Sequence, residues 1–482
     1  MKYIGLHKLI DENGVLIVPE GTKYIQSFAL QHCAKLKKVI LPNSLISIGM
    51  SAFDFCYNLK EVIFNEGLKK IDEEAFDTCS KLKSIVIPST VEIIKGNPFL
   101  GCENLKSIVV SKDNPHYDSR DNCNAIIRTK TNKLICGCTK TKIPSTITTI
   151  GETAFAYSKF KTCKLPSSIK KIEERAFVGC KNLRSIEIPE NVKIIEFDKL
   201  GNVFGNCKNL SSIKVSPLNK VYDSRNDCNA LIETKSNKLL SGCISTTIPE
   251  TITSIENNAF FGSNIESITI PDNVKEVGPC AFLCCEKLVS VKLPGFLKVL
   301  SHHLFAECSS LESVEIPESV ETIDRKCFAD CESMKSLFIP KNVSLIKEYP
   351  FSYYNKIESL KVDSLNKTYD SRNDCNAIIE TKTNTLIIGC ESTIIPDSVK
   401  VIGEDAFSFC LNLKSMVIPK NVNKISNSAF DDCQNLESVT ILNENTIIEE
   451  DTFIYCKKLK YLTIGEKKVN AKNYKQLISK FK

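Results

Sequence analysis

The chain has 482 residues, of which 42% are hydrophobic and 25% are charged, and its formal net charge is +6. These values are typical of a globular protein rather than a disordered or fibrous one, and they give no indication of nucleic-acid binding. No stretch approaches the roughly 18 to 20 apolar residues of a membrane span. We therefore expect neither a nucleic-acid partner nor a membrane-spanning segment.

The N-terminal segment 1–24 is expected to form a cap. Its stretch LIDENGVLIVP has the pattern of a truncated β-hairpin that covers the first unit of the repeat that follows. The segment has one early lysine but no continuous apolar core and no small-residue cleavage site. It therefore does not match a secretory signal, which favours an intracellular protein.

Residues 25–465 contain an internal repeat with the working consensus A-F-x-x-C-x-x-L-x-S-I-x-I-P-x-x-V-x-x-I. The phenylalanines that mark successive units, such as Phe53, Phe76 and Phe99, lie 23 residues apart. We count 15 units, the first of them a degenerate copy at Ala29 and Leu30. A unit this short cannot bury its own apolar face, so stacked units are predicted to form a solenoid with one rung per unit.

Each unit is predicted to contain a strand and a helical turn. The segment S-I-x-I-P alternates apolar and polar residues, so Leu82, Ile85 and Ile87 should point inward while Ser84 and Val86 point outward. The proline then ends the strand, because it has no N–H for the ladder. The A-F-x-x-C-x-x-L segment has apolar residues three apart and is expected to form a helical turn or short helix, which makes the fold class α/β.

Three longer segments interrupt the series and carry nearly the same text, YDSR followed by C-N-A-[IL]-I. Each is predicted to insert a β-hairpin, near residues 111–143, 216–248 and 363–395. The Asp and Asn side chains are expected to shape the entry to the hairpin by bonding nearby backbone N–H groups. Calcium binding by Asp370, Asn373, Asp374 and Asn376 is the alternative, although their spacing differs from the known calcium loop.

The last segment, 466–482, is expected to form a capping helix over the final rung. Its apolar residues Tyr474, Leu477, Ile478 and Phe481 follow helical spacing. Solenoids need such caps, because the end rungs otherwise expose their apolar faces.

The repeat unit and the YDSR insert resemble the BspA-like leucine-rich repeats, and the resemblance covers nearly all of the chain. It implies a leucine-rich-repeat solenoid without enzymatic activity. The family is best known from surface proteins of bacteria and parasitic protists, described as adhesion and host-matrix-binding modules. The resemblance thus implies the cell surface, whereas the N-terminal segment favours the cell interior, and both expectations stay open here.

Cysteine is the compositional outlier, with 23 residues. Twelve lie three residues after the marker phenylalanine of their unit or at the equivalent position, and are expected to form a column of reduced, buried thiols. This column, called the cysteine ladder below, comprises Cys33, Cys56, Cys79, Cys102, Cys180, Cys207, Cys285, Cys308, Cys331, Cys410, Cys433 and Cys456. Three hairpin pairs, Cys123 with Cys138, Cys228 with Cys243 and Cys375 with Cys390, are expected to be half-buried thiols, with disulfides as the alternative.

A further group of cysteines and histidines breaks the repeat pattern. Cys280, Cys284 and Cys285 lie one unit before His302, His303 and Cys308, and Cys280 and His303 occupy the same position relative to their phenylalanines. We expect no metal site and no cofactor, because no C-x₂-C pair is present, but zinc held by Cys280, Cys284 and His303 is the alternative. Cys136, Cys280, Cys284 and Cys327 lie off the ladder and are expected to be accessible.

The outward face of the strands offers the candidate binding surface. Its first outward position is almost always Ser, whereas the second varies in charge and size. The candidate ligand-binding residues in this variable column are Lys214, Thr269, Lys292, Glu315, Phe338 and Lys361. Because the chain lacks G-x-S-x-G, H-E-x-x-H and phosphate-loop motifs, we expect no enzyme. The predicted function is non-catalytic binding of a protein or other macromolecule, and the alternative is a structural or self-assembling solenoid.

Overall fold

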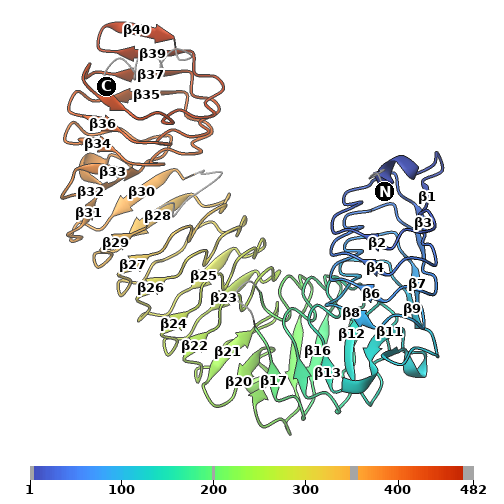
Figure 1. Cartoon of the computed structure of the whole chain (residues 1–482). Helices are drawn as coiled ribbons and strands as arrows, with labels where there is room; N and C mark the ends of the chain where they lie inside the picture. The colour runs from blue at the N-terminus through green and yellow to red at the C-terminus, as the bar shows by residue number, and fades with distance from the viewer. Residues whose placement is uncertain (1–4, 198–200, 348–356, 471–482) are drawn as a thin grey trace. The chain divides into compact units, whose positions relative to one another are not determined.

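The structure, a computed structural model, describes residues 5–197, 201–347 and 357–470. The chain divides into two compact units. Unit 1 consists of Met1–Thr247 and Asn257–Ser263, and unit 2 consists of Ile248–Glu256 and Asn264–Lys482. Within each unit, short strands of successive rungs lie side by side and form a series of small, mainly parallel sheets (Figure 1).

One side of most rungs carries the strand that the S-I-x-I-P segment predicted, although the equivalent segment 313–316 forms no regular strand. In unit 1 these strands are β1 (Val15–Ile17), β3 (Lys38–Ile40), β5 (Glu61–Ile63), β7 (Ser84–Ile87), β9 (Ser107–Val110), β14 (Thr162–Cys163), β16 (Ser185–Ile188) and β18 (Ser212–Val215). In unit 2 they are β23 (Ser267–Thr269), β25 (Ser290–Lys292), β28 (Ser336–Ile339), β30 (Ser359–Val362), β35 (Ser415–Ile418), β37 (Ser438–Ile441) and β39 (Tyr461–Ile464). We call these the long strands.

The inward and outward directions predicted for the long strands are confirmed. Ile85 and Ile87 of β7 are 2% and 0% exposed, whereas Val86 between them is 58% exposed. The buried side chains pack against the marker phenylalanines, whose rings form a stacked column, with ring centroids 4.8 Å apart between Phe53 and Phe76. Neighbouring rungs therefore complete each other's core, as expected for a solenoid.

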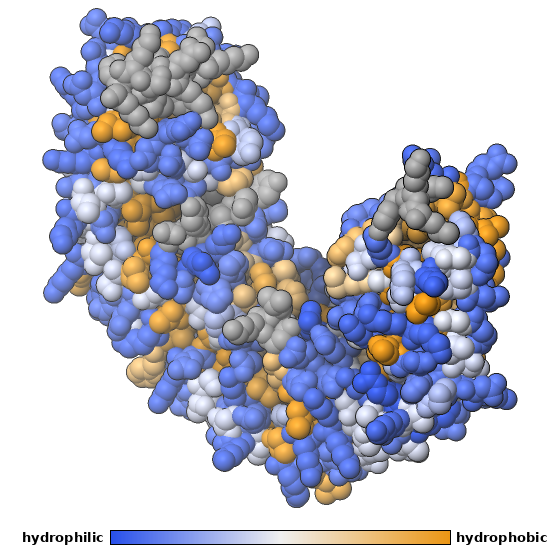
Figure 2. Space-filling view, viewed as in Figure 1, coloured by the Kyte–Doolittle hydropathy of each residue, from blue (hydrophilic) through white to orange (hydrophobic). Residues whose placement is uncertain are grey.

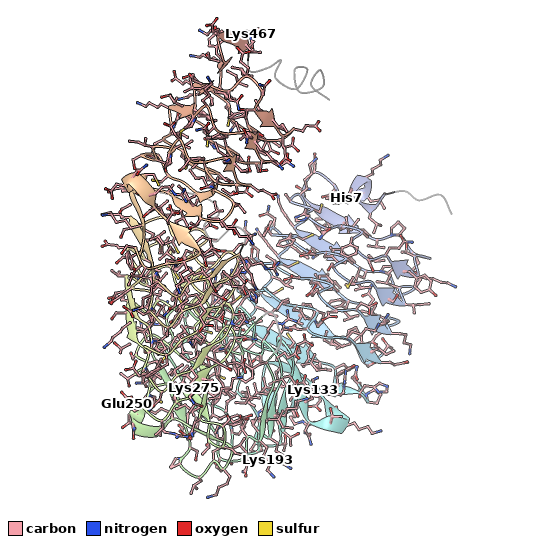
Figure 3. The ribbon with its side chains drawn as sticks, turned by 90° about the vertical axis from the view of Figure 1, so that its left-hand side faces the viewer. His7, Lys133, Lys193, Glu250, Lys275 and Lys467 are labelled. Carbon is pink, nitrogen blue, oxygen red and sulfur yellow. The ribbon has the colours of Figure 1, made fainter. Side chains whose placement is uncertain are left out.

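A second strand of two residues follows the proline on the next side of each rung. In unit 1 these strands are β2 (Tyr24–Ile25), β4 (Ser47–Ile48), β6 (Lys70–Ile71), β8 (Ile93–Ile94), β13 (Thr149–Ile150), β15 (Lys171–Ile172) and β17 (Ile194–Ile195). In unit 2 they are β22 (Ser254–Ile255), β24 (Glu276–Val277), β26 (Val299–Leu300), β27 (Thr322–Ile323), β29 (Leu345–Ile346), β34 (Val401–Ile402), β36 (Lys424–Ile425) and β38 (Ile447–Ile448). Figure 3 labels Lys193, immediately before β17, and Lys275, immediately before β24, each at the start of such a strand.

The third side of the rung is not helical, so the expected helical turn and the α/β class are wrong. The A-F-x-x-C segment instead forms consecutive turns, in which Ser51 and Phe55 have positive φ angles of 51° and 54°. This conformation directs the N–H groups of Ser51, Phe53 and Phe55 to carbonyls 22 residues later, at 3.3, 2.8 and 3.0 Å. These groups hydrogen-bond to the next rung rather than within their own segment, which an α-helix does not allow. The fold is a leucine-rich-repeat β-solenoid with almost no helix.

The only helices among the described residues are short 3₁₀ segments. They are η1 (Leu6–Leu9), η2 (Arg120–Asn122), η3 (Thr129–Thr131), η4 (Arg225–Asp227) and η5 (Arg372–Asp374). None of them is long or apolar enough to pass through a lipid bilayer.

Each of the three longer segments adds antiparallel strands to its unit. These strands are β10 (Tyr117–Asp118), β11 (Ala125–Arg128) and β12 (Lys133–Gly137), then β19 (Tyr222–Asp223), β20 (Leu231–Glu233) and β21 (Lys238–Ser241), then β31 (Tyr369–Asp370), β32 (Ile378–Glu380) and β33 (Thr385–Ile388). The first and last of these segments also rejoin the solenoid, because β12 pairs in parallel with β13 and β33 with β34. A phenylalanine count therefore misses turns, and the described chain has about 19 turns rather than 15.

The two predicted caps differ from the structure in detail. At the N-terminus, Ile10 and Leu16 form one antiparallel bridge, and β1 then pairs in parallel with β3 as an ordinary long strand. At the C-terminus, β40 (Lys467–Asn470) pairs antiparallel with β39, so the capping helix does not begin at residue 466. The apolar residues on which that helix was predicted, Tyr474 to Phe481, lie outside the described residues.

Candidate functional site

The six candidate residues of the outward column are all exposed on the long-strand face or in the equivalent part of their rung. Lys214 lies on β18 in unit 1, directly beside Glu187 of β16 in the parallel register. The alternation of the strand causes this exposure, since residues between two buried ones must point to solvent. The side chains of the column can therefore contact a partner without disturbing the core.

In unit 1 this face forms a groove with a volume of about 830 Å³. Lys164, Glu187 and Lys214 line it from three successive rungs, and the small residues Ser185 and Ser212 are among its other lining residues. With Glu190, which also lines the groove, it presents two positive and two negative charges beside a row of hydroxyl groups. Sequence reasoning placed these residues in outward columns but did not find the groove, because its depth depends on the prolines and loops beside the strands.

In unit 2 the outward residues align in pairs across neighbouring strands. Thr269 of β23 lies beside Lys292 of β25, and Phe338 of β28 lies beside Lys361 of β30. Phe338 is 51% exposed, which is unusual for an aromatic ring with buried neighbours on the same strand. Glu315 occupies the intervening rung, in a segment without a regular strand. The face combines positive charge with one large apolar contact.

The candidate metal residues separate into two columns of unit 2. The ligand atoms of Cys280, His302 and His303 all lie within 4.8 Å of one another. The Sγ of Cys284 instead donates to Glu307 Oε2 at 3.1 Å. The structure therefore brings Cys280 and His303 together as the stacking suggested, but it replaces Cys284 by His302 as the third member. Cys280 and Cys284 are both partly exposed, whereas Cys136 and Cys327 are 1% and 0% exposed, so the expected accessibility of the latter two is wrong.

The cysteine ladder has a hydrogen-bonding role in addition to its packing role. Cys79 Sγ donates to the carbonyl of Phe53 at 3.3 Å, and Cys308 Sγ donates to the carbonyl of Phe282 at 3.1 Å. The same contact recurs from other ladder thiols to the marker phenylalanine of the rung before. Burial, and then the neighbouring thiols Cys285 and Cys331, raise the pKa of Cys308 well above its usual range. Eleven of the twelve ladder cysteines are buried as expected, whereas Cys456 is partly exposed. The buried thiols have a structural role, because burial makes a thiol unreactive.

The hairpin cysteines contact backbone carbonyls. Cys243 Sγ donates to the carbonyl of Asn229 at 3.1 Å, and Cys228 Sγ lies 3.9 Å from the carbonyl of Ala230. All six cysteines of the three pairs are free and buried, rather than half-buried as expected. Their thiols are thus held by separate backbone partners in this structure.

The YDSR motif serves the architecture of the insert. Tyr117 Oη accepts a hydrogen bond from the N–H of Ile94 at 2.7 Å, which satisfies a buried donor at the end of a rung. Arg120 binds both oxygens of Asp118, through Nε at 2.7 Å and Nη2 at 2.6 Å. Burial alone would raise the pKa of Asp118, but the hydrogen bonds from Arg120 lower it below its usual value. The other two inserts repeat these contacts, as expected for a structural motif.

Comparison with known families agrees with this architecture. The description "BspA type Leucine rich repeat region (6 copies)" matches residues 14–124, 126–235, 232–358 and 380–476. The chain belongs to the BspA-type leucine-rich repeat family. Members of this family are repeat proteins that are generally non-catalytic, and the family is typical of surface proteins that bind macromolecules.

Solved structures of bacterial leucine-rich repeat proteins are similar to this chain. A leucine rich cell surface protein from Faecalibacterium prausnitzii is 26% identical, with a TM-score of 0.50, over 73% of this chain and 88% of that chain. A leucine-rich repeat protein from Eubacterium ventriosum is 22% identical, with a TM-score of 0.42, over 67% of this chain and 83% of that chain. No curated protein matches the chain.

Proposed function

We propose that the chain is a non-catalytic binding protein whose ligand is another macromolecule, in the first instance a protein, held on the outward face of the long strands. The observation that carries this proposal is the column of exposed, chemically varied residues on a backbone fixed by parallel pairing. Such a surface needs little ordering when it binds, which lowers the entropic cost of association. Solenoids in general bind macromolecules through extended faces of this kind.

The groove of unit 1 supports the proposal, because charged side chains from successive rungs line it and the side chains of a partner can enter it. Phe338 supports it in unit 2, because an exposed aromatic ring beside a cation is a frequent anchor in protein interfaces. Figure 2 shows mainly hydrophilic residues on the visible faces, with hydrophobic residues in small groups among them. This composition fits a reversible protein contact better than a permanent apolar interface. The likeness to a leucine rich cell surface protein supports a role in surface contacts.

Affinity capture from the native source, followed by mass spectrometry, tests this proposal. The wild type is compared with one face variant per unit, Lys164→Glu/Lys214→Glu in unit 1 and Lys292→Glu/Phe338→Ala in unit 2. Lys181→Glu is the matched control, since Lys181 is exposed but follows a ladder cysteine on the turn side. A partner retained by the control and reduced at least roughly tenfold by a face variant supports binding through that face.

Two outcomes contradict the proposal. Equal capture of the same proteins by all variants would show that the outward face is not the binding surface. Concentration-dependent self-assembly without any partner, measured by sedimentation velocity, would favour the alternative of a structural or self-assembling solenoid.

A further inference from the structure

The Cys280, His302 and His303 cluster of unit 2 is not explained by the repeat or by the proposed binding face. Cys280 and His303 occupy the same rung position, two residues before the marker phenylalanine, 23 residues apart. Both adopt the left-handed backbone conformation, with φ angles of 56° and 53°. The Cys280 N–H donates to the carbonyl of His302 at 3.1 Å, so the backbone of the next rung fixes the position of the cysteine.

We propose that Cys280, His302 and His303 form a binding site for a divalent transition-metal ion, and that zinc is the ion it takes. One thiolate and two imidazoles are donors that zinc accepts in proteins, with Zn–S near 2.3 Å and Zn–N near 2.0 to 2.1 Å. A tetrahedral ion with these bond lengths separates its ligand atoms by roughly 3.3 to 3.7 Å. The three ligand atoms already lie within 4.8 Å of one another. Each therefore needs to move by only about 1 Å, through a change of its side-chain torsion angles, to reach these separations.

The orientation of the two imidazoles suits this site. Their ring centroids are 5.5 Å apart and their planes are inclined by 83°, so the rings do not stack on each other. Adjacent residues of one chain thus present two ring nitrogens toward the thiol of the rung before. Three protein ligands fill three tetrahedral positions, and all three residues are partly exposed, which leaves the fourth position to water or to a donor group of a partner.

Zinc binds a neutral imidazole and a thiolate, so the ion displaces the proton of the Cys280 thiol when it binds. Hard cations such as Ca²⁺ and Mg²⁺ are disfavoured, because they prefer oxygen ligands.

Titration of the full chain with Co²⁺ and Zn²⁺ tests the site, because Co²⁺ bound to a thiolate in a tetrahedral site gives a charge-transfer band and strong visible bands. We expect one Co²⁺ per wild-type chain with these bands, and loss of the bands when Zn²⁺ is added. Cys280→Ser and His303→Asn should each remove the bands and weaken Zn²⁺ binding by more than about 100-fold, since loss of second-shell contacts alone costs 10- to 100-fold.

The variants are chosen so that a folding defect cannot imitate loss of the site. Serine keeps the size of Cys280, and asparagine tolerates the positive φ at His303. Cys284→Ser is the matched control, because it removes a partly exposed thiol four residues away whose Sγ contacts Glu307 instead. Melting temperatures without metal should be unchanged for all three variants.

The result that supports the proposal is loss of the cobalt bands in Cys280→Ser and His303→Asn but not in Cys284→Ser. Absence of a thiolate–cobalt band in the wild type would overturn it. The proposal would also be wrong if the bands persisted in Cys280→Ser, because another of the cysteines would then be the ligand. Stronger and stoichiometric binding of Ca²⁺ than of Zn²⁺ would contradict the choice of metal.

Discussion

Replacement of Phe305 by alanine in a central rung of unit 2 should destabilise that unit strongly. The ring of Phe305 is 0% exposed and stacks between Phe282 and Phe328, with centroid distances of 5.6 and 5.8 Å. Truncation of a buried phenylalanine removes its transfer free energy and leaves a cavity, at a cost of about 3 to 5 kcal/mol. Both neighbouring rings line that cavity, and the rungs above and below cannot close it without breaking their own parallel pairing.

The loss of stability in Phe305→Ala should be confined to nearby rungs, because each rung of a solenoid contacts mainly its two neighbours. Hydrogen exchange measured by mass spectrometry tests whether the destabilisation is local. The exchange rates of peptides around residues 282–328 are compared with those of peptides that contain the marker phenylalanines of unit 1. A cost of 3 to 5 kcal/mol corresponds to roughly 100- to 4,000-fold more frequent opening of the affected rungs. The exchange of the unit 1 peptides should not change.

The matched control is Ser313→Ala, an outward residue of the same rung. Exposed substitutions of this kind change stability by no more than about 0.5 kcal/mol. If Ser313→Ala accelerated exchange as much as Phe305→Ala, the inward and outward assignment would be wrong, and the proposed binding face with it.

Substitutions at Cys308, Tyr117 and Asp77 give three further tests. Cys308→Ser should retain more stability than Cys308→Ala in urea unfolding, because the hydroxyl can still donate to the carbonyl that the thiol contacts, and a difference of about 0.5 to 1.5 kcal/mol is expected. Tyr117→Phe should cost about 1 to 3 kcal/mol, since it leaves a buried N–H without its acceptor, whereas Tyr57→Phe at a 46% exposed ring should be neutral. Burial, followed by the carboxylates of Asp54 and Glu74, raises the pKa of Asp77 to about 6. The folded state then binds more protons than the unfolded state between pH 3.8 and about 6, so stability falls as pH rises through this window. Asp77→Asn should raise the melting temperature at pH 7.5 and leave it nearly unchanged near pH 3.5, and an equal shift at both values would contradict this assignment.

The long strands were predictable because their signal is local. Alternation at Ser84 to Ile87 and the proline after it specify which residues are buried and where the strand ends, and a strand on a solenoid obeys both rules. The turn side was mispredicted because apolar residues three apart occur in a helix and also in consecutive turns. The backbone hydrogen bonds of Phe53 and Phe55 to carbonyls of the next rung favour the turns over the helix. The sequence of a single unit does not contain these carbonyls, so it does not distinguish the two conformations.

The grouping of Cys280, His302 and His303 also depends on contacts between rungs, which a single repeat unit does not contain. Positions 23 residues apart stack, so Cys280 meets His303 and Cys284 meets Glu307. Sequence reasoning combined two columns that lie on opposite sides of the marker phenylalanine. Counting both cysteines from Phe282 separates the columns, because Cys280 precedes it by two residues and Cys284 follows it by two. The sequence placed His302 in the same cluster, but its choice over Cys284 as the third member depends on side-chain direction, which no spacing rule provides.

The cysteine ladder gives twelve of the about 19 turns a built-in probe of their own opening. A buried thiol reacts with an alkylating reagent only while its rung is open, so the labelling rate of each ladder cysteine measures the local free energy of opening. Peptide mass spectrometry can record Cys56, Cys79, Cys180, Cys308 and Cys433 in one experiment without introducing any label. The resulting profile along the chain would show where the solenoid begins to unwind, and whether the two units open independently.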